Sequence, residues 1–249
     1  MTMMASRVAT ERAAFTLPLL RDGMRLLDVG CGPGSLSVGL AEAVAPHGQL
    51  LGYDAEPSQV RTAQATCLTG GIVNARFEVA SAYELPVKDE TIDVYFSHAM
   101  YEHLSRPDRA LAEAYRVLRP GGALAIAASD WSQARIEPQT EDVALAMQGH
   151  YALRRRAGGD PFAGSRVATW ARNAGFEDIS EATTLRVDLS YDQLAAYVHA
   201  RLLTAAREAP VNSDLHDAEE AAARWVGTTG SAQQCWVEIT ARKPSPAEL

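Results

Sequence analysis

The chain has 249 residues, of which 47% are hydrophobic and 22% charged, so it is long enough to bury a sizeable core as one globular domain. A formal net charge of −8 argues against nucleic acid as a partner, because phosphate contacts need clustered Lys and Arg. The three cysteines form no zinc motif, charges interrupt the first apolar stretch, and no apolar run reaches the ~20 residues of a membrane helix. We therefore expect a single-domain cytoplasmic protein without a membrane span, either a monomer or a homodimer.

The most informative stretch is 25–34, where an apolar strand runs into a turn that contains Gly30, Gly32 and Gly34. Apolar residues at helical spacing follow over 35–45. A strand that stops on glycines and restarts as a helix leaves backbone N–H groups facing a crevice, and backbone without Cβ atoms can approach a ligand closely. The stretch predicts a binding site, although the glycines could also serve the turn alone.

An acidic residue follows the glycine turn at a sequence distance that is typical of nucleoside-binding folds. Asp54 lies 24 residues after Gly30, at the end of a second apolar run. In a doubly wound fold, an acid at this distance binds the hydroxyls of a ribose. The alternative is a helix cap ahead of Pro57. Together the glycine turn and the acid predict a nucleoside site.

Strand and helix patterns alternate over 25–128, which implies an α/β fold with a parallel sheet and helices on both of its faces. Helical patterns run over 57–68 and 107–118, and each begins with a proline, which suits a first helical turn. The expected strands are 25–29, 50–54, 75–80, 91–97, 123–128, 177–189 and 235–242.

Two segments interrupt this alternation. Residues 131–174 hold a long helical pattern and then Asp160 and Pro161, which are expected to cap and start the next helix. Residues 190–227 are expected to form two more helices. We interpret both segments, with the helical cap at 1–24, as a lid that shapes a substrate pocket beside a cofactor-binding core at 25–130. Extra core packing is the equal alternative.

The sequence resembles the class I S-adenosylmethionine-dependent methyltransferases. The acid-containing turn, Asp28-x-Gly30-x-Gly32-x-Gly34, lacks the longer glycine spacing of dinucleotide-binding domains. Further motifs that match this family lie at 80–86, 91–104 and 116–122, and the small-molecule and quinone-biosynthesis branch is the most similar. The resemblance implies a Rossmann-like, doubly wound sheet of seven strands, mostly parallel with a reversed last hairpin, and S-adenosyl-L-methionine as cofactor.

The resemblance also implies roles for individual residues. The three glycines would lie against the methionine part of the cofactor, Asp28 would orient the turn or face the amino group, and Asp54 would accept from both ribose hydroxyls. The remaining cofactor contacts that it implies are Ala55 beside the adenine, Ser81 and Ala82 in the adenine loop, and Ser97 near the amino acid moiety. Ser81 departs from the family, which often has an acidic residue there.

Acceptor-site candidates follow the fourth and fifth strands. His98 is the candidate general base, with pocket lining as the preferred alternative. His103 is read as structural, and the run 154–156 of three arginines as a solvated helix face that could also meet an anionic acceptor. The other residues predicted to line the acceptor pocket are Met100, Tyr101, Asp130, Trp131 and Tyr151. The sequence shows no acid cluster for a metal.

The sequence thus predicts in-line methyl transfer to a small, hydrophobic metabolite, with the oxygen, nitrogen or carbon nature of the acceptor left open. The alternative is a cyclisation or decarboxylation that uses the same fold and cofactor. A dehydrogenase and a catalytically silent binding partner fit the glycine turn and Asp54 less well.

Overall fold

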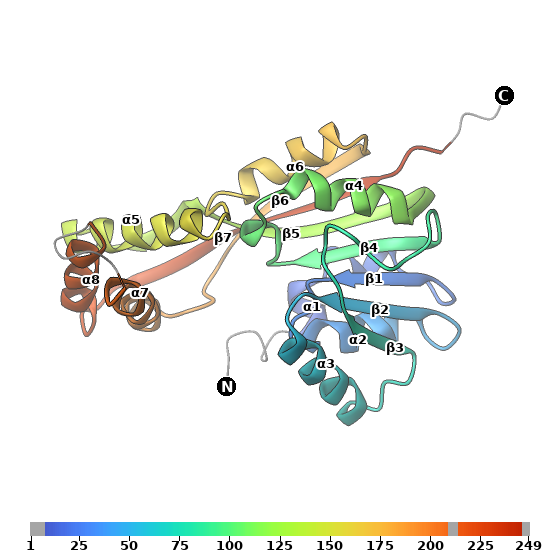
Figure 1. Ribbon diagram of the computed structural model, residues 1–249, viewed down its shortest axis with the longest axis horizontal. Helices are drawn as coiled ribbons and strands as arrows, with labels where there is room; N and C mark the ends of the chain where they lie inside the picture. The colour runs from blue at the N-terminus through green and yellow to red at the C-terminus, as the bar shows by residue number, and fades with distance from the viewer. Residues whose placement is uncertain (1–7, 209–213, 246–249) are drawn as a thin grey trace.

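The computed structural model describes residues 8–208 and 214–245 and contains a seven-stranded sheet in the order β3-β2-β1-β4-β5-β7-β6 (Figure 1). Strand β7 is antiparallel to both of its neighbours, and the other adjacent pairs are parallel. The predicted seven-stranded, mostly parallel sheet is therefore confirmed. The strands are β1 (Arg25–Val29), β2 (Gln49–Asp54), β3 (Ala75–Val79), β4 (Ile92–His98), β5 (Leu118–Glu137), β6 (Glu177–Arg186) and β7 (Ser231–Arg242).

The chain order reverses between β1 and β4, and this reversal determines where a ligand can bind. From β1 the chain steps outward through β2 to β3 and then returns to place β4 on the other side of β1. The connections that leave the carboxyl ends of β1 and β4 diverge to opposite faces of the sheet, which opens a crevice between them.

Each face of the sheet has its own hydrophobic core. Helices α4 (Pro107–Val117) and α6 (Gly164–Asn173) cover one face, and α1 (Ala9–Arg12), α2 (Ser35–Val44) and α3 (Pro57–Thr69) cover the other (Figure 1). In α4 the buried side chains recur at helical spacing, at Ala110, Leu111, Ala114 and Val117, so one face of the helix is apolar. This arrangement is the doubly wound architecture that the alternating pattern predicted.

Strands β5 and β7 extend well beyond the sheet as an antiparallel ribbon (Figure 1). Residues 131–137, predicted as part of a helical insertion, belong to β5, whose register shifts after Asp130 and resumes where Arg135 pairs with Gln233. The ribbon carries α5 (Glu141–Arg156), α7 (Tyr191–Ala206) and α8 (Asp214–Trp225), which enclose a third hydrophobic core. The predicted pair of helices between the sixth and seventh strands is therefore present.

Two local expectations were wrong. Helix α6 begins at Gly164 rather than Pro161, because the Asp160 carboxylate accepts from the Phe162 N–H in a turn instead of capping the helix. The N-terminal helical pattern yields only the short α1 and a 3-10 turn, η1 (Leu17–Leu19), with its first residues outside the described part. Within 8–208 and 214–245 no helix is both long and apolar enough to cross a membrane.

The glycine turn generates a stability prediction. Gly34 has φ +76°, and an added Cβ would lie 2.8 Å from the Ala63 Cα, whereas Gly71 has φ +72° with open space around it. Both alanine substitutions carry a left-handed backbone cost of about 1–2 kcal/mol, and overpacking adds about 1–3 kcal/mol at Gly34 alone. Urea unfolding should therefore show a larger loss for Gly34→Ala than for Gly71→Ala. Equal losses would contradict this account.

Candidate active site

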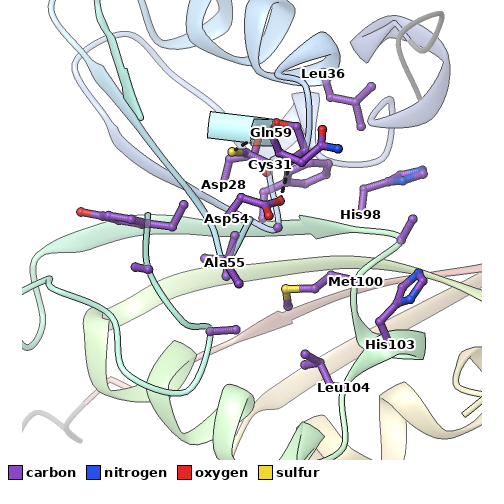
Figure 2. Close-up of a pocket in the computed structure, with 18 of the residues that line it drawn as sticks. Asp28, Cys31, Leu36, Asp54, Ala55, Gln59, His98, Met100, His103 and Leu104 are labelled. Atoms are coloured by element: carbon purple, nitrogen blue, oxygen red, sulfur yellow. Dashed lines mark hydrogen bonds between the residues drawn. The ribbon is translucent and has the colours of Figure 1, made fainter. Parts of the chain in front are cut away.

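A cavity of about 350 Å³, here called the main cavity, lies at the carboxyl ends of β1, β2 and β4, in the crevice that the chain reversal opens (Figure 2). It is lined by the turn after β1, the end of β2, the loop after β3 and the segment after β4. Its lining residues are Asp28, Val29, Gly30, Cys31, Gly32, Pro33, Ser35, Leu36, Tyr53, Asp54, Ala55, Gln59, Ala80, Ser81, Ala82, Tyr83, Phe96, His98, Ala99, Met100, His103 and Leu104.

Glycine is required at each of the three turn positions for a different structural reason. Gly30 has φ +74°, and a Cβ there would lie 2.9 Å from the Met100 side chain. Gly32 has φ +54° with no atom within 4 Å of an added Cβ, so its backbone faces open space in the main cavity. Gly34 lies outside the cavity lining and packs against α3. Gly30 and Gly32 therefore leave a cradle along the backbone that larger residues would fill.

Asp54 holds this cradle in place. One carboxylate oxygen accepts from the Gly32 N–H at 2.9 Å, and the other accepts from the Glu56 N–H at 2.9 Å. The cap of α3 is Glu56, whose side chain accepts from the Ser58 N–H. Asp54 is therefore not the helix cap, and its oxygens retain lone pairs that can accept further hydroxyl donors at the cavity wall.

Asp28 is a buried acid at the base of the main cavity. Its carboxylate accepts from the Ser37 hydroxyl at 2.6 Å, and the residue is 2% exposed. Burial raises the pKa of Asp28 to about 7, while the Ser37 hydrogen bond opposes that rise. A cation bound beside Asp28 would favour the ionised carboxylate, so this position suits an ammonium group.

The other predicted cofactor residues divide into two groups. Ala55, Ser81 and Ala82 line the main cavity. Ser97 is fully buried and lies outside the lining, because Phe96 and His98, on either side of it along the strand, are the residues that reach the cavity.

The residues predicted for the acceptor pocket do not lie together in one cavity. Met100 lines the main cavity, but Tyr101 is fully buried, with its hydroxyl 3.3 Å from that of Tyr95. Asp130 is fully buried and accepts from the Ser165 N–H at 2.7 Å, so it fixes the start of α6.

A second cavity of about 140 Å³, here called the side chamber, adjoins the main cavity and shares Ala99 and His103 with it. Trp131 lines this chamber and also a third cavity between β5 and α5, whereas Tyr151 lines only that third cavity of the two and packs against Phe162. The residues that line the side chamber are Ala99, Glu102, His103, Ser129, Trp131, His150, Arg154, Asp188, Leu189, Leu194, Tyr197, Ala232, Gln234 and Trp236.

Several residues of the side chamber were missed by the sequence analysis. His103, read as structural, lies on the wall shared by the two cavities. Arg154, read as solvated, is 9% exposed and contacts the His103 ring, with Nη1 2.8 Å from Nε2. A usable signal was present, because Met147, His150 and Arg154 recur at helical spacing on the buried face of α5.

A chain of contacts connects α1 with both cavities. Arg12 forms an ion pair with Asp188, which also accepts from the Trp236 indole N–H. The Trp236 ring stacks on His98, with ring centroids 4.7 Å apart. His98 lines the main cavity and Trp236 the side chamber, so this chain fixes the partition between them. The described residues contain no group of three His, Cys, Asp or Glu side chains that could hold a metal ion.

Residues 20–175 match the family model described as a methyltransferase domain, and the chain belongs to this family of S-adenosylmethionine-dependent methyltransferases. It is 33% identical over 180 residues to an uncharacterized methyltransferase of Schizosaccharomyces pombe, a match that covers 69% of this chain. It is also 33% identical over 179 residues to the 27-O-demethylrifamycin SV methyltransferase of Amycolatopsis mediterranei, with 66% of this chain covered. In each case the chain spans 63% of the relative's length.

Solved structures agree on the fold. The Haemonchus contortus phosphoethanolamine N-methyltransferase 2, in complex with phosphomonomethylethanolamine and S-adenosylhomocysteine, superposes with a TM-score of 0.65 at 16% identity. That match covers 95% of this chain and 53% of the other. The [4+2]-cyclase SpnF superposes with a TM-score of 0.64 at 25% identity, over 96% of this chain and 83% of that one. The open cradle and the two acids fit S-adenosyl-L-methionine, which is the cofactor of this enzyme.

Asp28 generates a pH prediction. Its folded pKa of about 7 lies above its ordinary value of 3.8, so the folded state holds a proton that the unfolded state has released between these values. The free energy of unfolding of the ligand-free protein should therefore fall as pH rises through this window. Asp28→Asn, which can still accept from Ser37, should remove this contribution when urea unfolding is compared across the window. Asp22→Asn, at an exposed acid whose pKa is lowered by His47, is the control. An unchanged slope in Asp28→Asn would contradict the prediction.

Proposed function

We propose that the enzyme transfers a methyl group from S-adenosyl-L-methionine in the main cavity to a small-molecule acceptor in the side chamber. The observation that carries this proposal is the shared wall of the two cavities, at Ala99 and His103. Two adjoining cavities allow a bound cofactor and an acceptor to meet without either entering the other's site. The rifamycin-modifying relative, which acts on a small molecule by its name, supports this class of acceptor.

The cofactor-binding roles follow from the cradle. The backbone at Gly30 and Gly32 would lie against the methionine part, and Asp28 would face its amino group. Asp54, already fixed by two backbone N–H groups, would accept from the ribose hydroxyls through its remaining lone pairs. Because those donors hold the carboxylate in place before binding, little side-chain freedom remains to be lost.

The adenine would lie between Ala55 and the loop after β3. Ala82 offers backbone groups to the ring, and the Ser81 hydroxyl, which accepts from the Tyr83 N–H at 3.2 Å, can donate to a ring nitrogen. This geometry gives Ser81 a use although it is not an acid. Ser97 is fully buried beneath the main cavity, so we give it no direct contact with the amino acid moiety.

When bound, S-adenosyl-L-methionine supplies a methyl group on a positively charged sulfur, so the protein's task is alignment. Trp131 and Trp236 give the side chamber aromatic walls, and Ala99 leaves an opening toward the main cavity. Holding the acceptor in line with the methyl group lowers the barrier, because the freedom of the two reactants is already lost on binding. The ribbon and its helices, the predicted lid, would exclude water from this space.

We assign His98 to the cavity wall, where its ring is held against Trp236. His103 is the histidine at the shared wall, but burial, reinforced by Arg154 and Arg201, lowers its pKa to about 4. At neutral pH it is therefore a neutral imidazole that accepts a proton weakly. This favours an acceptor that reaches the site already able to attack the methyl group.

A reaction without methyl transfer, such as a cyclisation, is the second candidate. The likeness to the [4+2]-cyclase SpnF, at 25% identity, favours it, because that protein shares the fold and is named for a different reaction. The two candidates differ in their products. Methyl transfer releases S-adenosylhomocysteine with each product, whereas cyclisation leaves the cofactor unchanged.

The proposal predicts that filling the side chamber abolishes turnover while cofactor binding persists. Ala232 is 6% exposed and lines the side chamber but not the main cavity. Ala232→Trp should therefore fill most of the 140 Å³ of the side chamber. The assay combines methyl-labelled S-adenosylmethionine with a panel of small ring compounds that bear hydroxyl, amino or carboxyl groups.

Wild type should form labelled product and S-adenosylhomocysteine in equal amounts. Ala232→Trp should form neither, while its affinity for S-adenosylhomocysteine stays unchanged. The control, Ala144→Trp, places the same side chain in the cavity beside α5, at a residue that does not line the side chamber, and should keep the activity. Substrate conversion without S-adenosylhomocysteine would favour cyclisation, and undiminished transfer by Ala232→Trp would place the acceptor elsewhere.

A further inference from the structure

The side chamber contains a buried positive charge that has no ion-pair partner within the described ranges. Arg154 on α5 lines the chamber and is 9% exposed, and none of the ion pairs in this part of the chain includes it. Glu102 acts on its charge from beyond ion-pair distance, and burial lowers the pKa of Arg154. Arg154 contacts the neutral His103 ring, but a buried guanidinium without an ion-pair partner is unfavourable, so its presence at a cavity wall points to a bound anion that would balance its charge.

Two neighbouring groups can also bind an anion. The Tyr197 hydroxyl accepts from Arg201 Nη1 at 3.0 Å, so its own proton is directed elsewhere. His150 is 2% exposed, and its Nδ1 has no hydrogen-bond partner among the residues that the structure describes. Both side chains line the same chamber as Arg154.

The charged groups in and around the chamber are nearly balanced. Asp188 forms an ion pair with Arg12, so Glu102 and Arg154 are the two remaining charged side chains of the lining, and Arg201, which acts on Arg154 from outside the lining, adds a second positive charge. Glu102 also accepts from the Ser129 hydroxyl at 3.0 Å.

The two histidines of the chamber respond to this positive charge. Burial is the main cause that lowers the pKa of His103 to about 4 and that of His150 to about 3. The positive charges of Arg154 and Arg201 lower both pKa values further. Both rings are thus neutral at physiological pH, so Arg154 is the cationic side chain on the chamber wall.

The size of the chamber limits what can enter. Its 140 Å³ is close to the roughly 150 Å³ cavity that holds a benzene molecule. Trp131 and Trp236 supply flat apolar surface, and Arg154 supplies the planar fork that a carboxylate or phenolate fits.

We propose that the side chamber recognises its acceptor as a small planar oxyanion, a carboxylate or an ionised ring hydroxyl on a single ring, held by Arg154 with Tyr197 and His150. This inference rests on the proposed function, because it names the class of acceptor for that same site. An acceptor bound as an anion already carries a lone pair for attack, so it needs no proton removal by His103.

The test compares charged and neutral probes of equal shape. Enzyme saturated with S-adenosylhomocysteine is titrated calorimetrically with benzoate and benzamide, and separately with 4-nitrophenolate and 4-nitroaniline. Wild type should bind the charged member of at least one pair tenfold or more tightly than the neutral member. The pair with the larger preference distinguishes a carboxylic from a phenolic acceptor.

Three variants test whether the preference for the charged probe depends on Arg154. Arg154→Gln should abolish it, and Arg154→Lys should keep part of it, because the charge remains while the fork is lost. Arg156→Gln removes the same charge from an exposed position two residues further along the chain and should leave the preference intact. Affinity for S-adenosylhomocysteine should be unchanged in all three, because none of these arginines lines the main cavity.

Equal affinity within both pairs, failure of every probe to bind, or a preference that survives Arg154→Gln would overturn the inference. Failure of wild type to bind S-adenosylhomocysteine would instead count against the proposed function, so the two failures can be distinguished. A melting temperature close to that of wild type shows that Arg154→Gln is folded.

Discussion

The hydrogen bond from the Gly32 N–H to Asp54 is the interaction on which the active site depends. It connects the turn after β1 with the end of β2, and the same carboxylate accepts from the Glu56 N–H at the start of α3. Because Gly32 has φ +54° and open space where a side chain would be, the bond holds the backbone in a shape that leaves room for a ligand. The protein's own hydrogen bonds thus hold the cofactor cradle in shape, which limits the conformational freedom that would be lost on binding.

The second constraint is the burial of charge where the ribbon meets the sheet. Strands β5 and β7 extend past the sheet and carry α5 and α7, which bring Arg154 and Tyr197 to the side chamber, where Arg154 contacts His103. The doubly wound core provides the main cavity, whereas the ribbon and its helices provide much of the side chamber, which we propose holds the acceptor. Changes in the ribbon can therefore alter the acceptor without altering the cradle, which is how one fold serves many reactions.

The sequence predicted the features that depend on local patterns. Alternating strands and helices, the glycine turn and the spacing to Asp54 all lie within short stretches, so the parallel sheet and the main cavity followed from them. The length of β5 did not, because residues 131–137 form a strand only through pairing with the distant β7. Arg154 was misread for the same reason, since a run of arginines looks solvated until another element covers one of them.

Errors of a single residue had a different cause. Ser97 was placed in the cofactor site by its position at the end of β4, but side chains alternate along a strand and its neighbours His98 and Phe96 reach the cavity instead. Tyr101 and Asp130 were likewise placed near the acceptor by chain order alone. In the structure they serve the core and the start of α6.

The most direct test of the central claim is calorimetric titration of wild type, Asp54→Ala and Glu56→Ala with S-adenosylmethionine, S-adenosylhomocysteine and NAD. Wild type should bind both sulfur compounds saturably and NAD not at all. Asp54→Ala should bind them at least tenfold more weakly, a loss of about 1.4 kcal/mol, while Glu56→Ala, which loses only the α3 cap, should match wild type. Binding of NAD alone, or sulfur-compound affinity that Asp54→Ala leaves unchanged, would contradict the account.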